Sequence, residues 1–487
     1  MTLRAPKSAV KFFNRFLRKA KECAPPYIVN FLPTLLTAFA LTSTHSLTGI
    51  GAEVHSDKRD KSSISRMLRS KKFRTRDLHW NTLKPVLASF ALKPGQKVNW
   101  HVAIDSTANQ RGAFTKILGA ILHKMRPERA AKLEPTSGKK GRRTKYHTFL
   151  VAMLTTHEGV RIPLPRYTCD PKTFNRQGRP CNVRKTQIDL AVLMLEQLLD
   201  MLPYGVRLIV TADSYYESEK LTSLAHSRGF LFISPSDSNR CFANEDSPKK
   251  SNGERIRDYG LNLPMDSFSR LDLVRGQEDT ASYRRYSERK TGPKDRRTYR
   301  LCHERRTVAG LGTVGIVYSW KTPVYEPKRN FRKQSFKVLI CSDPNFPGEQ
   351  VVEWYECRWT AIEIVFRELK QQLGFEDFTG QSLEALERYI DLVLLSFLYL
   401  EMERARLLAA TSTPEPVKRQ AKTARTLGMQ AVIRAEAARE ALGEVKKALQ
   451  SKRPSRIVMD FLEELTQSYR PELLQPQHSS AVSAVSQ

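Results

Sequence analysis

The sequence predicts an α/β protein in which a mixed β-sheet with flanking helices is interrupted by a β-rich insertion and bounded by helical N- and C-terminal regions. Three observations support this fold class. Short apolar runs alternate with amphipathic helical patterns between residues 98 and 234, a polar and Arg-rich stretch follows, and an apolar run with two helical patterns comes after it. The predicted regions are 1–95 (helical, DNA-binding), 96–235 (first part of the catalytic core), 236–334 (β-rich insertion), 335–405 (second part of the core) and 406–487 (basic, helical, with a disordered tail).

The N-terminal region is punctuated by the Pro25-Pro26 pair and by Pro33, Pro85 and Pro94-Gly95, which favour several short helices. Residues 62–69 combine serine caps with an apolar face and outward basic residues. This pattern suits a recognition helix that presents Ser65, Arg66 and Arg69 to DNA, with residues 47–54 as its supporting helix. An ordinary basic surface helix accounts for the same residues.

The core region follows the order strand, hairpin, helix, strand, helix, strand. The predicted elements are strand 98–104, hairpin 148–156 with 160–167, helix 187–202, strand 207–212, helix 217–228 and strand 229–234. Asp105 and Asp213 each follow a strand directly. If those two strands are neighbours, both carboxylates lie at the same edge of the sheet. An aspartate at such a place also commonly caps the following helix.

After the insertion, with its strand-like run 311–320, the sequence predicts a strand over 336–341, a helix over 355–374 and a second helix over 383–402. In the first helix the apolar residues recur at helical spacing and predict one buried stripe: Trp359, Ile362, Phe366, Leu369 and Leu373. Glu363 and Lys370 lie beside it, about 10.5 Å apart along the helix axis. Pairing of Glu363 with Arg367 at i+4 is the simpler interpretation of that carboxylate.

The charge balance points to a polyanionic partner. The chain has 81 Lys and Arg against 50 Asp and Glu, a net charge of +31. Such a field favours nucleic acid first and an acidic membrane surface second. The cations are concentrated in three separated blocks, 57–76, 124–145 and 284–306, as expected for a groove that follows a phosphate backbone.

The seven cysteines form no CxxC pair and no zinc spacing. Reduced thiols in a cytoplasmic protein are therefore expected. The apolar run 27–41 is broken by Pro33, is too short to span a bilayer and lacks a convincing cleavage region after it, so neither a membrane span nor a signal peptide is expected.

Asp105, Asp213 and Glu363 together suggest phosphodiester chemistry. Two Mg²⁺ or Mn²⁺ ions about 3.5–4 Å apart can activate an attacking oxygen and neutralise the leaving one, and such hard cations prefer carboxylate oxygens. Three carboxylates from different elements suffice, because the substrate phosphate supplies further ligands. The sequence therefore predicts these residues as catalytic and metal-binding.

The order of elements resembles the ribonuclease-H-like fold. The segments IDST (104–107), VTADSYY (210–216) and YECRWTAIEIVFRELKQQLG (355–374) resemble the DDE transposases of bacterial insertion sequences, and more narrowly the cut-and-paste group with a Tyr-Arg-Glu-Lys signature. The resemblance spans roughly residues 45–405. It implies that Tyr355, Arg358 and Lys370 contact the phosphates of the element's ends, and that an aromatic of the insertion, here Trp320, stacks on a flipped base. A strand tryptophan packed on a core is the alternative for Trp320.

The signature departs from the family at one place. The family has three residues between the Arg and the Glu, whereas four (WTAI) separate Arg358 from Glu363; the six residues between Glu363 and Lys370 are kept. Glu356 and Glu368 are the competing candidates for the third carboxylate. Glu368 lies five residues after Glu363, about 140° around the helix, and should face elsewhere.

The sequence thus favours a DNA transposase of a prokaryotic, nucleoid-associated kind. It would bind terminal inverted repeats, act as a homodimer in the synaptic complex, and cut and join DNA, with a hairpin intermediate implied by the resemblance alone. The alternatives are a ribonuclease-H-like nuclease without strand transfer and a non-catalytic basic DNA-binding protein.

Overall fold

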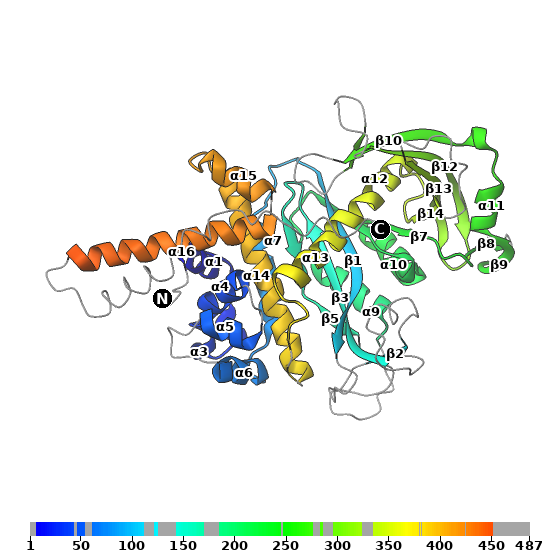
Figure 1. Ribbon diagram of the computed structural model, residues 1–487. Helices are drawn as coiled ribbons and strands as arrows, with labels where there is room; N and C mark the ends of the chain where they lie inside the picture. Colours follow the sequence, from blue (N-terminus) through cyan, green and yellow to red (C-terminus); the bar gives the residue numbers. More distant parts are fainter. Residues whose placement is uncertain are drawn as a thin grey trace, which may run out of the picture.

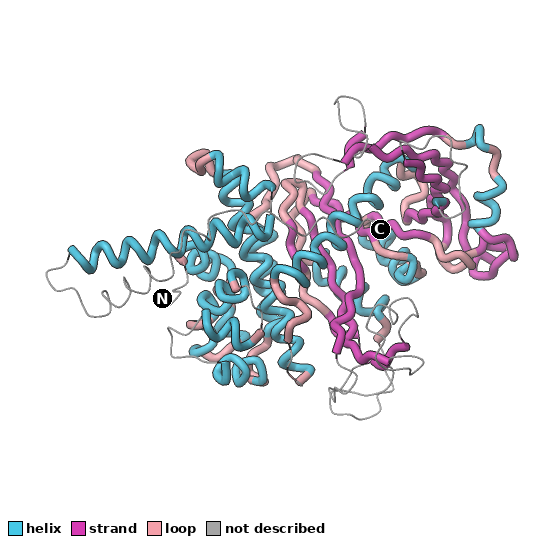
Figure 2. Tube along the Cα trace, in the orientation of Figure 1, coloured by secondary structure: helices cyan, strands magenta, loops and turns pink. Residues whose placement is uncertain are grey.

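The computed structural model describes residues 6–42, 46–53, 61–111, 121–124, 143–169, 185–244, 247–275, 283–285, 296–323, 335–378, 380, 382–423 and 425–450. A helical region lies at one end of the molecule, and a large sheet runs from its middle to the other end (Figures 1 and 2). The three basic blocks fall partly outside the described residues, and the tail after residue 450 falls wholly outside them.

The centre of the sheet has the order β3–β1–β6–β7–β14. Its strands are β3 (Arg143–Thr155), β1 (Val98–Arg111), β6 (Val206–Thr211), β7 (Leu231–Pro235) and β14 (Phe336–Cys341). β1 is parallel to β6 and β6 to β7, whereas β3 and β14 are antiparallel to their neighbours. Two short strands, β4 (Arg161–Pro163) and β5 (Tyr167–Cys169), return along β3, and β2 (Ile121–Lys124) also pairs with it. This mixed α/β architecture confirms the predicted fold class and is consistent with the expected ribonuclease-H-like sheet.

The strands between residues 236 and 334 extend the same sheet, because β14 pairs with β7 on one side and with β13 on the other. They are β8 (Cys241–Asn244), β9 (Ser247–Arg255), β10 (Ser269–Arg275), β11 (Tyr283–Arg285), β12 (Arg296–Val308) and β13 (Gly312–Pro323). Helix α11 (Ile256–Asn262) packs beside β14 and β9. The β-rich segment is therefore continuous with the core through hydrogen-bonded strands.

Helices cover both faces of the central strands. Ile209, Leu231 and Ile233 lie in one apolar cluster with Val351 and Val352 of α12 (Gly348–Arg358). Alternate residues of β6 and β7, such as Val210 and Phe232, join the cluster of α9 (Gln187–Leu199) and α10 (Glu219–Arg228). This alternation follows from the period of two in a strand, and it explains why β6 reads as a continuous apolar run.

The N-terminal helices pack around the long helix α14 (Leu383–Ala409), which contacts α4, α6 and α7 (Figure 1). They are α1 (Lys7–Phe16), α2 (Ala20–Cys23), α3 (Pro26–Val29), α4 (Leu32–Leu41), α5 (Leu47–Glu53), α6 (Lys61–Arg69) and α7 (Thr75–Ala88). The apolar run 27–41 supplies α4, most of which is buried. Among the described helices, none is long and apolar enough to cross a membrane.

The C-terminal region forms α15 (Glu415–Thr423) and α16 (Arg425–Gln450), and α16 projects from the helical region (Figure 1). Its inner end is tied to the body, because Gln430 donates hydrogen bonds to the carbonyls of Ala40 and Gln372. The described cysteines are all free.

Two predicted boundaries are wrong. Strand β1 does not end at Ile104 but runs to Arg111, because β3 continues to pair with it beyond the last β6 partner. The helix predicted from Tyr355 begins seven residues earlier, at Gly348, so Tyr355 and Arg358 lie inside a helix and not before it. Pro347, which precedes the first helical residue, supplies the fixed backbone angle at this start.

A buried ion network joins the helical region to the sheet. Arg161 of β4, fully buried, donates to Glu401 of α14 at 2.6 Å and to Glu368 at 3.2 Å. Arg404 donates to the other Glu401 oxygen at 3.1 Å, and Thr426 donates to Glu368 at 2.7 Å. Burial alone would raise the pKa of Glu401, but the two arginines outweigh it and lower that pKa. Each charge in this network depends on the others for compensation.

We expect Arg161→Met to lower the free energy of unfolding by about 3–5 kcal/mol, because it leaves Glu368 buried without its cation and Glu401 with Arg404 alone. Arg228→Met is the matched control, since Arg228 pairs with Asp200 at the surface, where the two side chains are 39% and 67% exposed. That control should cost at most about 1 kcal/mol. Urea denaturation followed by circular dichroism measures both; equal losses would contradict a structural role for the network.

Candidate active site

The pairing of β1 with β6 places two of the predicted carboxylates side by side. The parallel ladder ends with Ala103 opposite Thr211. Asp105 and Asp213 each lie two residues further, so they occupy equivalent positions beyond the ladder. The predicted adjacency of the two strands is confirmed, although Asp105 lies within β1, opposite Val151 of β3, and not at the strand's end. Asp213 caps a short 3-10 turn by accepting a hydrogen bond from the Tyr215 amide at 3.0 Å.

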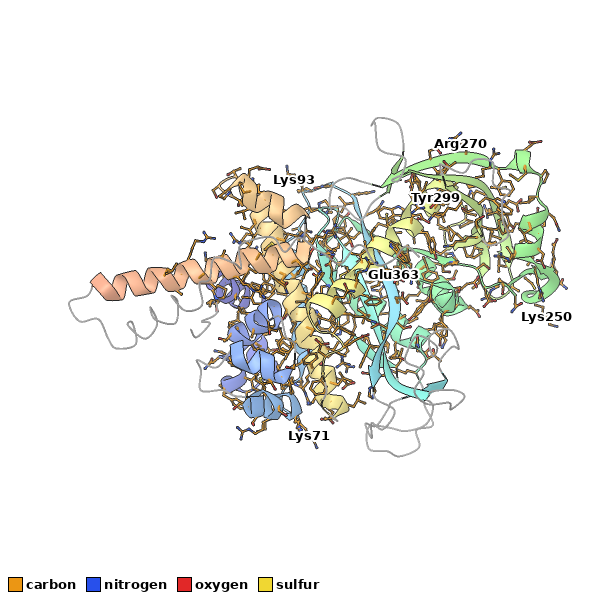
Figure 3. All side chains as sticks on the ribbon, in the orientation of Figure 1. Lys71, Lys93, Lys250, Arg270, Tyr299 and Glu363 are labelled. Carbon is orange, nitrogen blue, oxygen red and sulfur yellow. The ribbon has the colours of Figure 1, made fainter. Side chains whose placement is uncertain are left out.

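Glu363 reaches the same place from the helix above. The helix that crosses the sheet has three parts: α12, a π-helical turn over Trp359–Glu363, and α13 (Ile364–Gln372). The turn contacts β1 and β3, and Glu363 lies over β1 near the middle of the molecule (Figure 3). Its π character is fixed by the hydrogen bond that the Ile364 amide donates to the Trp359 carbonyl, five residues back.

The π turn accounts for the unusual spacing of the signature. In an α-helix, residues five apart differ by about 140° in direction. A π turn takes roughly one residue more per turn and brings such residues to nearly the same side. Arg358 and Glu363, five apart, can thus both face Asp105. The turn also rotates Trp359 outward. Its side chain is 54% exposed and does not join the predicted buried stripe, whose other four members are buried.

Arg358 forms an ion pair with Asp105. Its Nη2 atom donates to Asp105 Oδ2 at 2.6 Å, and the two side chains are only 11% and 14% exposed. The other Asp105 oxygen accepts from the Ser106 amide at 2.7 Å. Arg358 Nε is buried and has no hydrogen-bond partner among the described residues. A buried donor left in this state costs about 1–3 kcal/mol, so the guanidinium is only partly satisfied where it lies.

Asp213 and Glu363 both act electrostatically on Asp105. Burial raises the pKa of Asp105 to about 6; Arg358 opposes this rise, while Asp213 and Glu363 add to it. Burial also raises the pKa of Tyr355 to about 12; Arg358 opposes this rise, while the charges of Glu356, Asp213 and Asp105 add to it. Charges of both signs, the carboxylates and Arg358, therefore meet at this edge of the sheet.

Asp105 and Glu363 line one open cleft of about 400 Å³. Two cations, Arg367 and Lys370, share the lining with Ser106, Thr107, Trp359 and Phe366. Lys370 is held by Glu376, with 2.7 Å between Nζ and Oε1. The cleft thus joins carboxylates and cations, a combination that suits a phosphate chain held next to metal ions. From the sequence, Arg367 was expected only as an ion-pair partner of Glu363, and its place in the cleft lining was missed. No role was predicted for Ser106 or Thr107.

The competing carboxylates face other partners. Glu356 accepts from Lys321 at 3.0 Å, and Glu368 belongs to the buried network around Arg161. The expectation that Glu368 faces away from Glu363 is confirmed. Neither residue lines the cleft of Asp105 and Glu363.

Two predicted DNA contacts occupy different environments. Tyr355 is half-buried beside the carboxylates, and Lys337 Nζ lies 5.2 Å from the centre of its ring. Trp320 is 7% exposed and packs on Phe336, with 4.8 Å between ring centres. The indole is thus part of the core formed by β13 and β14. This is the environment that the alternative predicted, a strand tryptophan packed on a core. The stacking of Trp320 on a flipped base stays a prediction.

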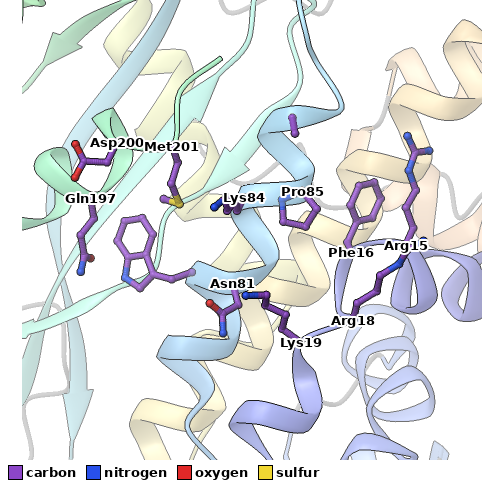
Figure 4. A pocket seen from close by; sticks show the side chains of 12 residues that line it. Arg15, Phe16, Arg18, Lys19, Asn81, Lys84, Pro85, Gln197, Asp200 and Met201 are labelled. Carbon is purple, nitrogen blue, oxygen red and sulfur yellow. The ribbon is translucent and has the colours of Figure 1, made fainter. Parts of the chain in front are cut away.

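A second cleft of about 520 Å³ lies between α1, α7 and α9 (Figure 4). Arg15, Arg18, Lys19 and Lys84 surround an apolar floor that includes Trp80 and Met201. Its one carboxylate, Asp200, already pairs with Arg228. This cleft has the charge to attract phosphate but lacks the carboxylates that metal-dependent chemistry requires.

The donor set suits Mg²⁺ or Mn²⁺ in chemistry, since the three predicted carboxylates lie on β1, just after β6 and in the π turn. Asp213 is not among the residues that line the cleft of Asp105 and Glu363. As the side chains stand, however, no three Asp, Glu, His or Cys residues within the described ranges are grouped closely enough to hold an ion. Arg358 on Asp105 supplies a positive charge at this position instead. A metal would therefore require the Asp105 side chain to exchange its partner.

Residues 180–399 match the family model described as Transposase DDE domain. The match supports a DDE-type transposase. The match covers Asp213 and Glu363 but begins after Asp105. Asp105 lies on β1, which pairs with β6 of the matched region. Comparison of the chain with curated proteins finds no match. The matched residues thus include two of the three predicted carboxylates, and the pairing of β1 with β6 adds the third.

We expect deletion of Trp359 to convert the π turn into regular α-helix while Arg358 and Glu363 remain on one face, now four residues apart. Because Trp359 is exposed, the deletion should lower the thermal midpoint only slightly. Deletion of Arg367, also exposed but inside α13, is the matched control. It should turn the following residues by about 100° and lower the midpoint much more. Equal effects in thermal unfolding would contradict the role assigned to the π turn.

Proposed function

We propose that the protein is a DNA transposase that binds the terminal inverted repeats of an insertion sequence and cuts and joins DNA with Asp105, Asp213 and Glu363. The observation that carries this proposal is the matched register of the two aspartates beyond neighbouring parallel strands, with Glu363 presented over them by the π turn. The family match and the net charge of +31 agree with it.

The three carboxylates would hold two Mg²⁺ or Mn²⁺ ions, which supply activation of water or a 3′-hydroxyl and relief of charge on the leaving oxygen. Lys370 and Arg367 line the same cleft and would bind the phosphates on either side of the scissile bond. Tyr355 and Arg358 lie next to the carboxylates and would fix the position of the strand that is cut. The walls of the cleft orient the DNA so that the attacking oxygen and the phosphorus are close together.

DNA ends would be bound by the N-terminal helices. On α6, Ile64, Met67 and Leu68 are buried, while Arg66 and Arg69 are exposed and Ser65 is half-buried. The helix thus presents a basic face outward, with α5 packed against it. In the proposed cycle two protomers pair the ends, water attacks one strand, and the freed 3′-hydroxyl attacks the opposite strand, forming a hairpin, or attacks target DNA.

A nuclease on the same fold would cut but not join, and a non-catalytic DNA-binding protein would do neither. The experiment uses purified protein, Mg²⁺ and a duplex that carries the DNA flanking the gene. Cleavage distinguishes the two enzymes from the binding protein. Covalent joining of the cut end to a second duplex distinguishes the transposase from the nuclease, and an absence of both products would overturn the proposal.

We expect Asp105→Ala, Asp213→Ala and Glu363→Gln each to abolish cleavage, because each removes a metal ligand, while DNA binding by gel shift stays nearly intact. Glu356→Gln and Glu368→Gln are the matched controls, since those carboxylates bind Lys321 and Arg161. Both controls should retain cleavage under conditions in which they stay folded. If Glu363→Gln still cleaves DNA and Glu356→Gln does not, the third metal ligand is Glu356 and not Glu363.

We expect the double variant Arg66→Ala/Arg69→Ala to weaken DNA binding and to reduce the slope of log affinity against log salt concentration by about 2, one for each lost phosphate contact. The control is Lys250→Ala/Arg255→Ala, two exposed cations at β9, at the opposite end of the molecule (Figure 3). Fluorescence anisotropy over a salt series measures both. An unchanged slope in the α6 variant would assign end binding to another surface.

A further inference from the structure

We propose that Arg358 acts as an internal counter-ion that closes the metal site in the absence of DNA, and that a DNA phosphate releases it, so that DNA and metal bind cooperatively. This inference rests on the proposed function, because it takes Asp105 as a metal ligand and DNA as the substrate. It assigns to Arg358 a task distinct from a phosphate contact alone.

The ion pair is the first observation. Arg358 and Asp105 belong to different elements, 253 residues apart in the chain, and meet at 2.6 Å with little exposure to water. With its second oxygen engaged by the Ser106 amide, Asp105 has both oxygens occupied. Each oxygen keeps a second lone pair, but the positive charge of the guanidinium repels a divalent cation from the same carboxylate, so each ligand weakens the binding of the other.

The incomplete satisfaction of Arg358 is the second observation. Of its nitrogens, Nη2 alone donates to Asp105, and the buried Nε has no partner among the described residues. A guanidinium carries five donors in a planar fork that matches a phosphate group bidentately. A phosphate in the neighbouring cleft therefore offers Arg358 more hydrogen bonds than Asp105 gives it.

The π turn is the third observation. It begins directly after Arg358 and ends at Glu363, so the arginine and the proposed metal-binding glutamate are the two ends of one irregular segment. Such turns are less regular in hydrogen bonding than α-helix and are frequent at functional sites. A change in the direction of Arg358 can be accommodated here without moving α13, which the Glu368 network anchors.

The other signature cation is held in a similar way. Lys370, which lines the cleft, pairs with Glu376 at 2.7 Å. Both cations predicted to meet DNA are thus neutralised by the protein's own carboxylates. Lys370, however, takes up a carboxylate that is not a proposed metal ligand, so only Arg358 couples DNA to the metal.

The ion pair with Asp105 predicts that Arg358 lowers the metal affinity of the site in the absence of DNA. If Asp105 is free of Arg358 in about one-tenth of the molecules, the site binds metal about tenfold more weakly than it would without the arginine. Removing Arg358 should therefore strengthen metal binding. If instead the arginine only orients Asp105 for the metal, its removal should weaken metal binding.

The test measures Mn²⁺ binding by the full chain without any activity readout, using electron paramagnetic resonance of the free ion. Arg358→Gln should bind Mn²⁺ about tenfold more tightly than the unaltered protein. Arg228→Gln is the matched control, because it removes a guanidinium that pairs with a different aspartate, Asp200, outside this cleft. It should leave the Mn²⁺ affinity unchanged. Equal or weaker binding by Arg358→Gln, with Arg228→Gln unchanged, would overturn the proposal.

A second arm adds duplex DNA of arbitrary sequence at low salt, where phosphate contacts dominate. DNA should tighten Mn²⁺ binding by the unaltered protein and by Arg228→Gln, but not by Arg358→Gln; an increase in all three would overturn the coupling. Asp105→Ala separates this inference from the proposed function. Unchanged Mn²⁺ binding in that variant would mean that the metal lies elsewhere, whereas reduced binding with no effect of Arg358→Gln rejects the counter-ion role alone.

Discussion

The backbone pairing of β1 with β6 is the constraint on which the rest of the structure depends. Six consecutive residue pairs fix the register, and this register alone decides that Asp105 and Asp213, 108 positions apart, lie at equivalent places beyond the ladder. A slip of one residue would turn the Asp105 side chain to the opposite face of the sheet. Buried apolar residues on both faces, such as Val210 and Ile209, resist such a slip, so the packing of the core also maintains the geometry of the site.

The helix that carries Glu363 is positioned by contacts away from the chemistry. Val351 and Val352 fix α12 against the sheet, while Glu368 ties α13 to Arg161 and, through Glu401, to α14. The π turn between these two anchored segments absorbs one extra residue, so the irregularity lies where the carboxylate must be aimed. Apolar packing thus holds the helix before the π turn, and buried ion pairs hold the helix after it.

The arrangement of charge gives the site its character. A chain with net charge +31 gathers three carboxylates at one sheet edge and holds two of the nearby cations in internal ion pairs. Such pairs keep the carboxylates compensated while DNA is absent, and they leave donors that a phosphate can take over. In the proposed function, the residues that attract DNA are therefore also the residues that hold the carboxylates in ion pairs.

The sequence by itself determined the fold class, the order of the core strands along the chain and the three carboxylates, because alternation, helical spacing and the position of acids after strands are local patterns. It also indicated that Glu368 faces away from Glu363, since five residues of spacing along a helix correspond to a rotation of about 140°. Only the tertiary structure decided the length of β1, the π turn, the partner of Arg358 and the burial of Trp320. Each of these depends on pairing or packing with residues distant in the chain, such as β3 for the length of β1 and Phe336 for Trp320, and no local pattern encodes such contacts.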